Sequence, residues 1–318
     1  MTVGAPPPQQ PATVVPDWAA RRERSNMLAL RVMAWIAVHL GRRVARWVLH
    51  PISLYFVLFS PAARRQSIRY LRRALGREPG WGDGYRHVHA FASTVLDRVW
   101  FVRGRLQEFD LRLEGGELVD ATLAEGRGAL LLGAHVGSFE ALHAVGSSRP
   151  GMRVAMVMYP DNARMIHAAL QAIEPGFELR IIAIGRAGST LAIRDWLDSG
   201  GLAGLLGDRF LDAAAARHSS AVERMFLGAP ARFTDGPLRL AMLLRRQVIF
   251  MVGLYRGGKR YDVRLEPLAD FRDLPDAPAE REQRLQQAIS DYAARLEALC
   301  REAPYNWFNF HDFWLEDA

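Results

Sequence analysis

The stretch GALLLGAHVGSFEALHA, residues 128–144, decides how this chain is interpreted. An apolar run bounded by glycines, residues 129–132, predicts a buried strand. Gly137 and Ser138 then precede the apolar positions of FEALHA, which predicts the start of a helix. His135 therefore falls in a strand-to-helix turn at the carboxyl edge of a sheet, where α/β proteins bind their ligands.

Glu140 follows His135 by five positions and is expected about one turn into the predicted helix. A carboxylate that is hydrogen-bonded to one imidazole nitrogen fixes the tautomer and raises the basicity of the other nitrogen. This spacing predicts His135 as a general base and Glu140 as the residue that orients it. The alternative is a hydrogen-bonded surface pair, because paired ionisable groups are often structural.

Strand-like and helix-like runs alternate along the rest of the chain. The strand-like runs lie at residues 110–114, 129–132, 154–158, 180–184, 202–206, 248–254 and 261–266. Helical patterns lie at residues 62–75, 84–102, 139–145, 163–172, 190–197, 236–244 and from about 278 to 302. The alternation predicts a single α/β domain with a largely parallel central sheet flanked by helices, and the alternating 110–114 run is expected at an edge.

The N-terminal quarter differs from this pattern. Residues 1–17 are proline-rich and without a period, which predicts a disordered tail, and residues 18–75 are predicted to be helical and membrane-associating. Residues 47–63 carry no charge but contain Pro51 and Pro61. A spanning helix needs about 20 apolar residues, so this run favours a helix or hairpin lying in one leaflet. A buried apolar helix of a soluble protein is the alternative.

Composition limits the partners and the chemistry. The formal net charge of +7 suggests an acidic partner: nucleic acid, anionic lipid or an acidic protein. Cys300 is the only cysteine, which excludes internal disulfides and a thiolate zinc cluster. The chain has no P-loop, no G-x-G-x-x-G and no G-x-S-x-G, and its histidines show no metal-ligand spacing. We therefore expect neither a metal nor a cofactor.

Residues 135–140, HVGSFE, resemble the HxxxxD/E motif of the lysophospholipid acyltransferase superfamily, in the Glu form of the lauroyl- and myristoyl-type late acyltransferases of lipid A biosynthesis. Three further segments resemble this family in the same order, at residues 202–210, 225–254 and 304–314. The similarity spans about residues 25–315 and assigns residues 76–318 to an acyltransferase domain.

The resemblance implies an enzyme at the cytoplasmic face of a bacterial inner membrane. It would move an acyl chain from a thioester to a hydroxyl or amine of a lipid or glycolipid acceptor, with His135 taking the acceptor proton. Acyl carrier protein is the expected donor, because that partner is acidic and this chain is basic; a coenzyme A thioester is the alternative. Nucleic acid is not expected as a partner.

Asp208 and Arg209 follow the 202–206 run directly and are expected to bind substrate in the cleft. Arg209, or backbone N–H groups at the helix start, would stabilise the oxyanion. A surface ion pair is the alternative for these two residues.

Two segments depart from the family pattern. Where the family has an Arg-Pro-Asn-type segment, this chain reads YPDNAR at residues 159–164, which makes Asn162 and Arg164 the candidate substrate-binding residues there. The closing segment reads WFNFHDF instead of Trp-x-His-Arg-Arg-Phe. The acceptor is therefore open among a lipid A precursor, an ornithine-type lipid and an aryl polyene headgroup. A basic membrane- or nucleic-acid-binding protein without catalysis is the alternative from another class, and substitution of His135 distinguishes it.

Overall fold

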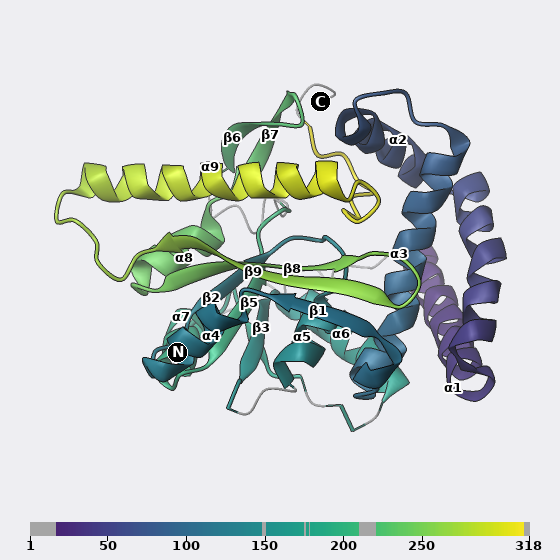
Figure 1. Ribbon diagram of the computed structural model, residues 1–318, viewed down its shortest axis with the longest axis horizontal. Helices are drawn as coiled ribbons and strands as arrows, with labels where there is room; N and C mark the ends of the chain where they lie inside the picture. Colours follow the sequence, from purple (N-terminus) through teal and green to yellow (C-terminus); the bar gives the residue numbers. More distant parts are fainter. Residues whose placement is uncertain (1–16, 148–150, 175, 178, 210–220, 315–318) are drawn as a thin grey trace, which may run out of the picture.

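The structure is a computed structural model that describes residues 17–147, 151–174, 176–177, 179–209 and 221–314 (Figure 1). All but one residue of the predicted tail, residues 1–17, lies outside the described residues. The helices are α1 (Asp17–Phe59), α2 (Pro61–Leu75), α3 (Trp81–Val102), α4 (Gly116–Ala124), α5 (Phe139–Ser147), α6 (Pro160–Ile173), α7 (Ser189–Asp198), α8 (Gly236–Leu243) and α9 (Pro278–Glu302). The strands are β1 (Asp110–Glu114), β2 (Leu130–Gly133), β3 (Val154–Met158), β4 (Ile181–Ala183), β5 (Leu202–Leu206), β6 (Ala221–Phe226), β7 (Ala229–Thr234), β8 (Gln247–Tyr255) and β9 (Arg260–Asp270).

A 7-stranded sheet in the order β1-β9-β8-β2-β5-β3-β4 forms the centre of the molecule. The β8–β9 pairing is antiparallel, and the other pairings in this sheet are parallel. This confirms the predicted α/β domain with a largely parallel sheet, and β1 lies at an edge as expected. In the parallel β2–β5 pair, Gly133 lies opposite Leu206, so both strands end at the same level.

Helices cover both faces of the sheet, which explains why its central strands are continuous apolar runs. Helix α9 crosses one face, whereas α4 and α5 lie on the other (Figure 1). Leu130 and Leu132 belong to the core cluster that contains Ile289 of α9, and Leu131 belongs to the cluster with Val119 of α4. The alternation of side chains along β2 therefore ties both helical layers to one strand.

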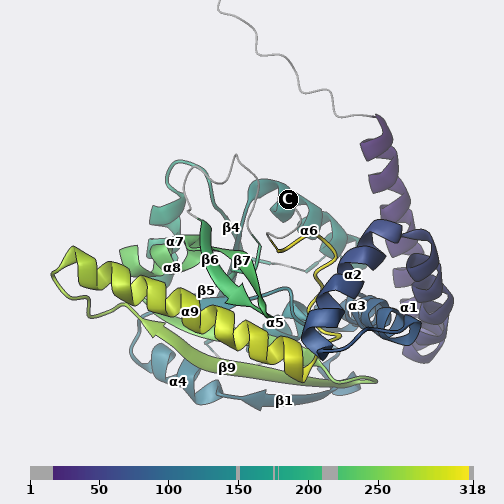
Figure 2. The same ribbon diagram turned by 90° about the horizontal axis from the view of Figure 1, so that it is seen from above.

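Helices α1, α2 and α3 form a separate layer at one end of the sheet (Figures 1 and 2). Asp97 of α3 is completely buried and receives two 2.8 Å hydrogen bonds from Arg42 of α1. The hydroxyl of Tyr261 on β9 also donates to this carboxylate, over 2.9 Å. These contacts fix α1 and α3 to strand β9 of the sheet.

The 47–63 run with its two prolines is interrupted before Pro61, where α2 begins, and α1 contains a further break that was not predicted. The non-helical residue inside α1 is Gly41, with φ 80° and ψ 169°, whereas Pro51 lies within the helical stretch that ends at Phe59. A backbone with positive φ suits glycine, and this is the physical reason for the kink at Gly41. Within the described part of the chain, no helix has the length and hydrophobicity needed to cross a bilayer.

Two further elements were not predicted: α4, and the antiparallel hairpin of β6 and β7. Leu227 and Gly228 join the two strands and both have positive φ, 50° and 82°. Positive φ at both central residues is typical of a type I′ hairpin turn, which usually carries Asn or Asp where this chain has leucine.

Candidate active site

The turn between β2 and α5 holds His135 at the carboxyl edge of the sheet, as predicted. Gly137 makes this turn possible, because its φ is 65° and a Cβ there would lie 2.0 Å from the carbonyl oxygen of Gly253. The Ser138 N–H donates to that same carbonyl over 2.8 Å, which draws the turn against β8. The Ser138 hydroxyl accepts the Ala141 N–H and so caps α5.

Asp208 is the carboxylate that contacts the imidazole of His135. Oδ1 of Asp208 accepts a 2.8 Å hydrogen bond from His135 Nδ1, and Oδ2 accepts one of 2.9 Å from the His135 backbone N–H. Oδ2 also accepts the indole N–H of Trp307 over 2.8 Å. With Nδ1 protonated, the neutral imidazole presents Nε2 as its basic nitrogen.

Asp208 is 2 % exposed, yet it stays ionised. Burial alone would raise its pKa; the charge of His135 and the hydrogen bonds from His135 and Trp307 oppose this and lower the pKa to about 2. At neutral pH the site therefore contains a buried, ionised carboxylate that is hydrogen-bonded to an imidazole.

Glu140 does not make the contact with His135 that the spacing predicted. It lies in the first turn of α5, where Arg98 of α3 forms a 2.7 Å ion pair with its Oε1 and the Ser138 hydroxyl donates to its Oε2 over 3.2 Å. The positive end of the helix dipole and Arg98 both favour a carboxylate at this place. The position next to Nδ1 is instead taken by Asp208, because β5 is the parallel neighbour of β2.

Arg209 follows Asp208 and lines the same pocket as His135. Arg209 is exposed, but desolvation by the protein around it lowers the pKa of its guanidinium from the usual value, and the charge of Asp208 opposes this shift. An arginine remains cationic in such surroundings. The backbone N–H groups of residues 135–138 are all engaged within the protein, by Asp208, Ala134, Asn306 and Gly253 in that order. These four N–H groups are therefore not available to an oxyanion, whereas Arg209 lies at the wall of the pocket.

Asn162 and Arg164 are both exposed on α6, and neither is among the described residues that line the pocket. Helix α6 contributes Ile166 and Leu170 to the pocket instead. The structure therefore brings together His135, Asp208 and Arg209 but leaves the two α6 candidates outside this group.

A cavity of about 200 Å³ opens beside His135. Its walls come from α3, from the β2–α5 turn and α5, from α6 and the segment after it, from β3, from the end of β5 and from the segment after α9. Most of the lining is apolar, and it includes Phe91, Val95, Phe101, Phe139, Met156, Leu170, Leu206 and Phe308. The polar groups are few, namely Thr94, Arg98, His135, Glu140, His143 and Arg209. A mostly apolar cavity with a few convergent polar groups is typical of a small-molecule or acyl-chain site. No group of three or more His, Cys, Asp or Glu side chains within the described ranges is placed to hold a metal.

A family model described as bacterial lipid A biosynthesis acyltransferase matches residues 28–316. The chain belongs to this family. The match covers nearly the whole chain, confirms the resemblance, and makes the protein an acyltransferase of the lipid A type, with an acyl donor and a lipid acceptor as its general substrates. No curated protein matches the chain.

Arg98 contacts the candidate site but was not expected there from the sequence, whereas Trp307 lies in the closing segment that resembles the family and only its contact with Asp208 was not predicted. Arg98 lies within α3, remote in sequence from the HxxxxE motif, and Trp307 follows α9. Nothing in the sequence near either residue signals its partner. For Asp208 a signal did exist: it stands two residues after β5, just as His135 stands two residues after β2.

Proposed function

We propose that this protein transfers an acyl chain from a thioester, with acyl carrier protein as the preferred donor, to a hydroxyl or amine of a lipid A-like lipid or glycolipid. The observation that carries the proposal is the 2.8 Å hydrogen bond between His135 Nδ1 and Asp208 at the wall of an apolar cavity. Membership of the acyltransferase family supports the reaction class.

In the proposed reaction, His135 Nε2 accepts the proton of the acceptor hydroxyl or amine as its oxygen or nitrogen attacks the thioester carbonyl. The resulting C–O or C–N bond forms as the carbonyl becomes a tetrahedral oxyanion. The C–S bond then breaks, and the thiolate leaves with the proton returned by His135. Asp208 stabilises the imidazolium that exists between these two proton transfers and keeps Nδ1 protonated.

Arg209 is proposed to stabilise the oxyanion, because it is a cation at the wall of the same cavity. Glu140 keeps a role in the site through Arg98: the ion pair holds both side chains at the cavity wall. The apolar remainder of the wall suits a hydrocarbon chain, which would be removed from water there.

The direct test is acyl transfer by purified protein, measured as thiol release with an acyl-carrier-protein thioester and a lipid A precursor. His135→Ala is expected to lower turnover by about 10²–10⁴-fold, the usual contribution of a general base. His167→Ala is the matched control, because His167 is exposed on α6 outside the cavity, and it should retain full turnover. Wild-type turnover in His135→Ala would refute the mechanism.

The donor is tested by the same assay across an ionic-strength series. An acidic carrier protein that is steered by the net positive charge should show a KM that rises with salt, because the Debye length falls from about 10 Å at 0.1 M to about 3 Å at 1 M. The matched coenzyme A thioester serves as the comparison. A carrier-protein KM that does not respond to salt, or a strong preference for coenzyme A, would overturn the donor assignment and leave the His135 chemistry intact.

The proposal also places α1 on the cytoplasmic face of the inner membrane. Most of the exposed large apolar side chains of the described residues lie on this one helix: Trp35, Val38, Leu40, Val44, Trp47, Leu54, Tyr55, Phe56, Leu58 and Phe59. An apolar helix face with Trp and Tyr and with neighbouring arginines suits the boundary between lipid headgroups and acyl chains.

Binding to vesicles of phosphatidylethanolamine and phosphatidylglycerol tests this placement. The double substitution of Trp47 and Phe59 by serine, at positions 76 % and 67 % exposed, should remove most of the binding. The same substitution of Met225 and Leu243, 66 % and 69 % exposed on β6 and α8, should leave it unchanged. Helix α8 lies at the end of the sheet away from α1 (Figure 1). Equal effects of the two pairs would contradict the placement of α1.

A further inference from the structure

The carboxylate of Asp208 is held from two sides. His135 supplies two of its three donors, through Nδ1 and the backbone N–H, and Trp307 supplies the third, through the indole N–H. Among the described residues, Trp307 is the only donor to this carboxylate that does not belong to the β2–α5 turn. Its bond to Oδ2 restrains rotation of the carboxylate, and Oδ1 is thereby kept opposite Nδ1.

Trp307 is itself immobilised by aromatic packing. The side chain is 1 % exposed and makes edge-to-face contacts with Tyr70, Phe226 and Phe313, with ring centroids 5.0, 5.3 and 4.9 Å away. These rings come from α2, β6 and the closing segment, so three separate elements define where the indole N–H points. An indole N–H is a donor only, and it holds the ionised carboxylate without exchanging a proton with it.

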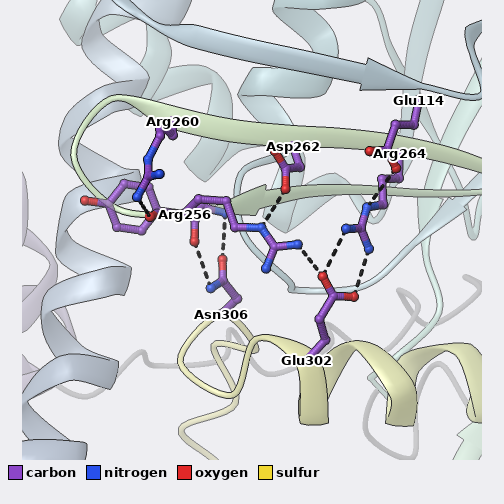
Figure 3. A network of polar contacts seen from close by, with 8 residues as sticks. Glu114, Arg256, Arg260, Asp262, Arg264, Glu302 and Asn306 are labelled. Carbon is purple, nitrogen blue, oxygen red and sulfur yellow. Dashed lines mark hydrogen bonds and ion pairs between the residues drawn. The ribbon is translucent and has the colours of Figure 1, made fainter.

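The backbone around Trp307 is fixed to the same turn. Its carbonyl accepts a 2.8 Å hydrogen bond from Nε2 of the buried His87, and the next N–H, of Phe308, donates over 2.8 Å to the carbonyl of His135. Asn306 precedes it and binds the backbone of Tyr255 (Figure 3). Its side-chain oxygen accepts the Tyr255 N–H over 2.7 Å, and its side-chain N–H donates to the Tyr255 carbonyl over 3.1 Å. Residues 306–308 therefore contact both the main chain of the β2–α5 turn and the carboxylate of Asp208.

We propose that Trp307 is a positioning residue of the acyl-transfer reaction, which acts by holding the Asp208 carboxylate in line with His135. The inference rests on the proposed function, since it assigns Trp307 a part in the chemistry of that site.

The alternative is a purely structural role, because a buried tryptophan usually has a hydrogen-bond partner for its N–H. Trp314 provides a comparison for this alternative. It belongs to the same aromatic cluster, is 6 % exposed, and donates its indole N–H over 3.0 Å to the backbone carbonyl of Phe226. The two residues differ in what the indole N–H holds: the carboxylate of the site in one case and a main-chain carbonyl in the other.

The test compares Trp307→Phe with Trp314→Phe in full-length protein, with kcat, KM and thermal stability measured for both. Both substitutions should lower the melting temperature. Trp307→Phe alone should also lower kcat by about 10-fold with little change in KM, the loss expected for one hydrogen bond to a charged group. Equal kcat values in the two variants would overturn the inference.

Because Trp307 is almost completely buried, a second variant avoids the change of shape. Incorporation of 3-benzothienylalanine at position 307 replaces the indole N–H by sulfur and keeps the bicyclic ring. The same fall in kcat is expected, and wild-type kcat would overturn the inference. His135→Ala, assayed alongside, distinguishes a failure of the proposed function from a failure of the role of Trp307. If it is fully active the proposed function fails; if it is inactive while the benzothienyl variant is fully active, only the role of Trp307 fails.

Discussion

Two clusters of charged side chains link the sheet to the C-terminal part of the chain, and they differ in burial. At the carboxyl ends of β2 and β5, Asp208 is 2 % exposed and binds His135 and Trp307. At the C-terminal end of α9, Glu302 binds Arg264 through two hydrogen bonds of 2.8 and 3.0 Å and also binds Arg256 (Figure 3). The Glu302 side chain is 39 % exposed.

The cluster around Glu302, called the surface cluster below, contains more ion pairs, but we expect it to contribute less to stability than the buried Asp208. Its members are Glu114, Arg256, Asp262, Arg264 and Glu302, and they connect β1, β9 and the residue that follows β8 with the end of α9. Exposed ion pairs contribute about 0–1 kcal/mol, because water and salt screen them. A buried carboxylate, by contrast, depends on each of its donors. We therefore expect burial, and not the number of ion pairs, to decide which cluster contributes more to stability.

The Arg42–Asp97 pair gives the largest expected effect on stability. It tests the role of burial at a place outside the candidate active site. Arg42→Met should lower the free energy of unfolding by about 3–5 kcal/mol, because the fully buried Asp97 loses its two hydrogen bonds from Arg42 and keeps only Arg46, 4.0 Å away, as a cationic partner. Arg43→Met, at the exposed neighbouring position, should change it by less than about 0.5 kcal/mol. Denaturant unfolding of both variants is the measurement, and equal effects would break the link between burial and stability.

Asp208 gives an intermediate effect that depends on pH. Its pKa is about 2 in the folded protein and near 3.8 in the unfolded chain. Ionised Asp208 therefore stabilises the folded state above about pH 4. This contribution, about 2 kcal/mol, should be lost as the pH falls from 4 to 2. Asp208→Asn should lack this part of the acid destabilisation when unfolding free energies are compared at pH 4.5 and 2.5. Parallel losses in wild type and variant would contradict the assignment.

Glu302→Gln should have the smallest effect. The free energy of unfolding should fall by no more than about 1 kcal/mol, and the difference from wild type should shrink further in 1 M NaCl. Acyl-transfer activity should be unchanged, because none of the surface cluster lines the cavity. A loss as large as that of Arg42→Met would show that exposed ion pairs contribute more than burial allows.

Much of this fold could be predicted from the sequence, because its buried parallel strands are short apolar runs such as Leu202–Leu206. The β6–β7 hairpin was not predicted, because its turn is Leu227-Gly228 and carries no usual turn signal. The kink of α1 at Gly41 was not predicted, because a single glycine inside a helical pattern is often tolerated without a break.

From the sequence, site residues could be placed within a single strand-to-helix turn, but contacts between different turns could not be predicted. His135 follows from the strand, the turn and the helix that surround it, and Asp208 and Arg209 were expected in the cleft for the same reason. Which carboxylate binds His135 depends on the order of strands in the sheet, and Asp208 lies 73 positions away in sequence. Glu140 is near in sequence, but the first turn of α5 directs it to Arg98.

A double-mutant cycle on acyl transfer tests the central claim, that His135 and Asp208 act as one unit. The kcat/KM of His135→Ala, of Asp208→Asn and of the double variant is measured with the same thioester and acceptor. Each single substitution should lower kcat/KM by about 10²–10⁴-fold, and the double variant should be no slower than the slower single variant. Losses that multiply in the double variant, or wild-type kcat/KM in Asp208→Asn, would contradict the account.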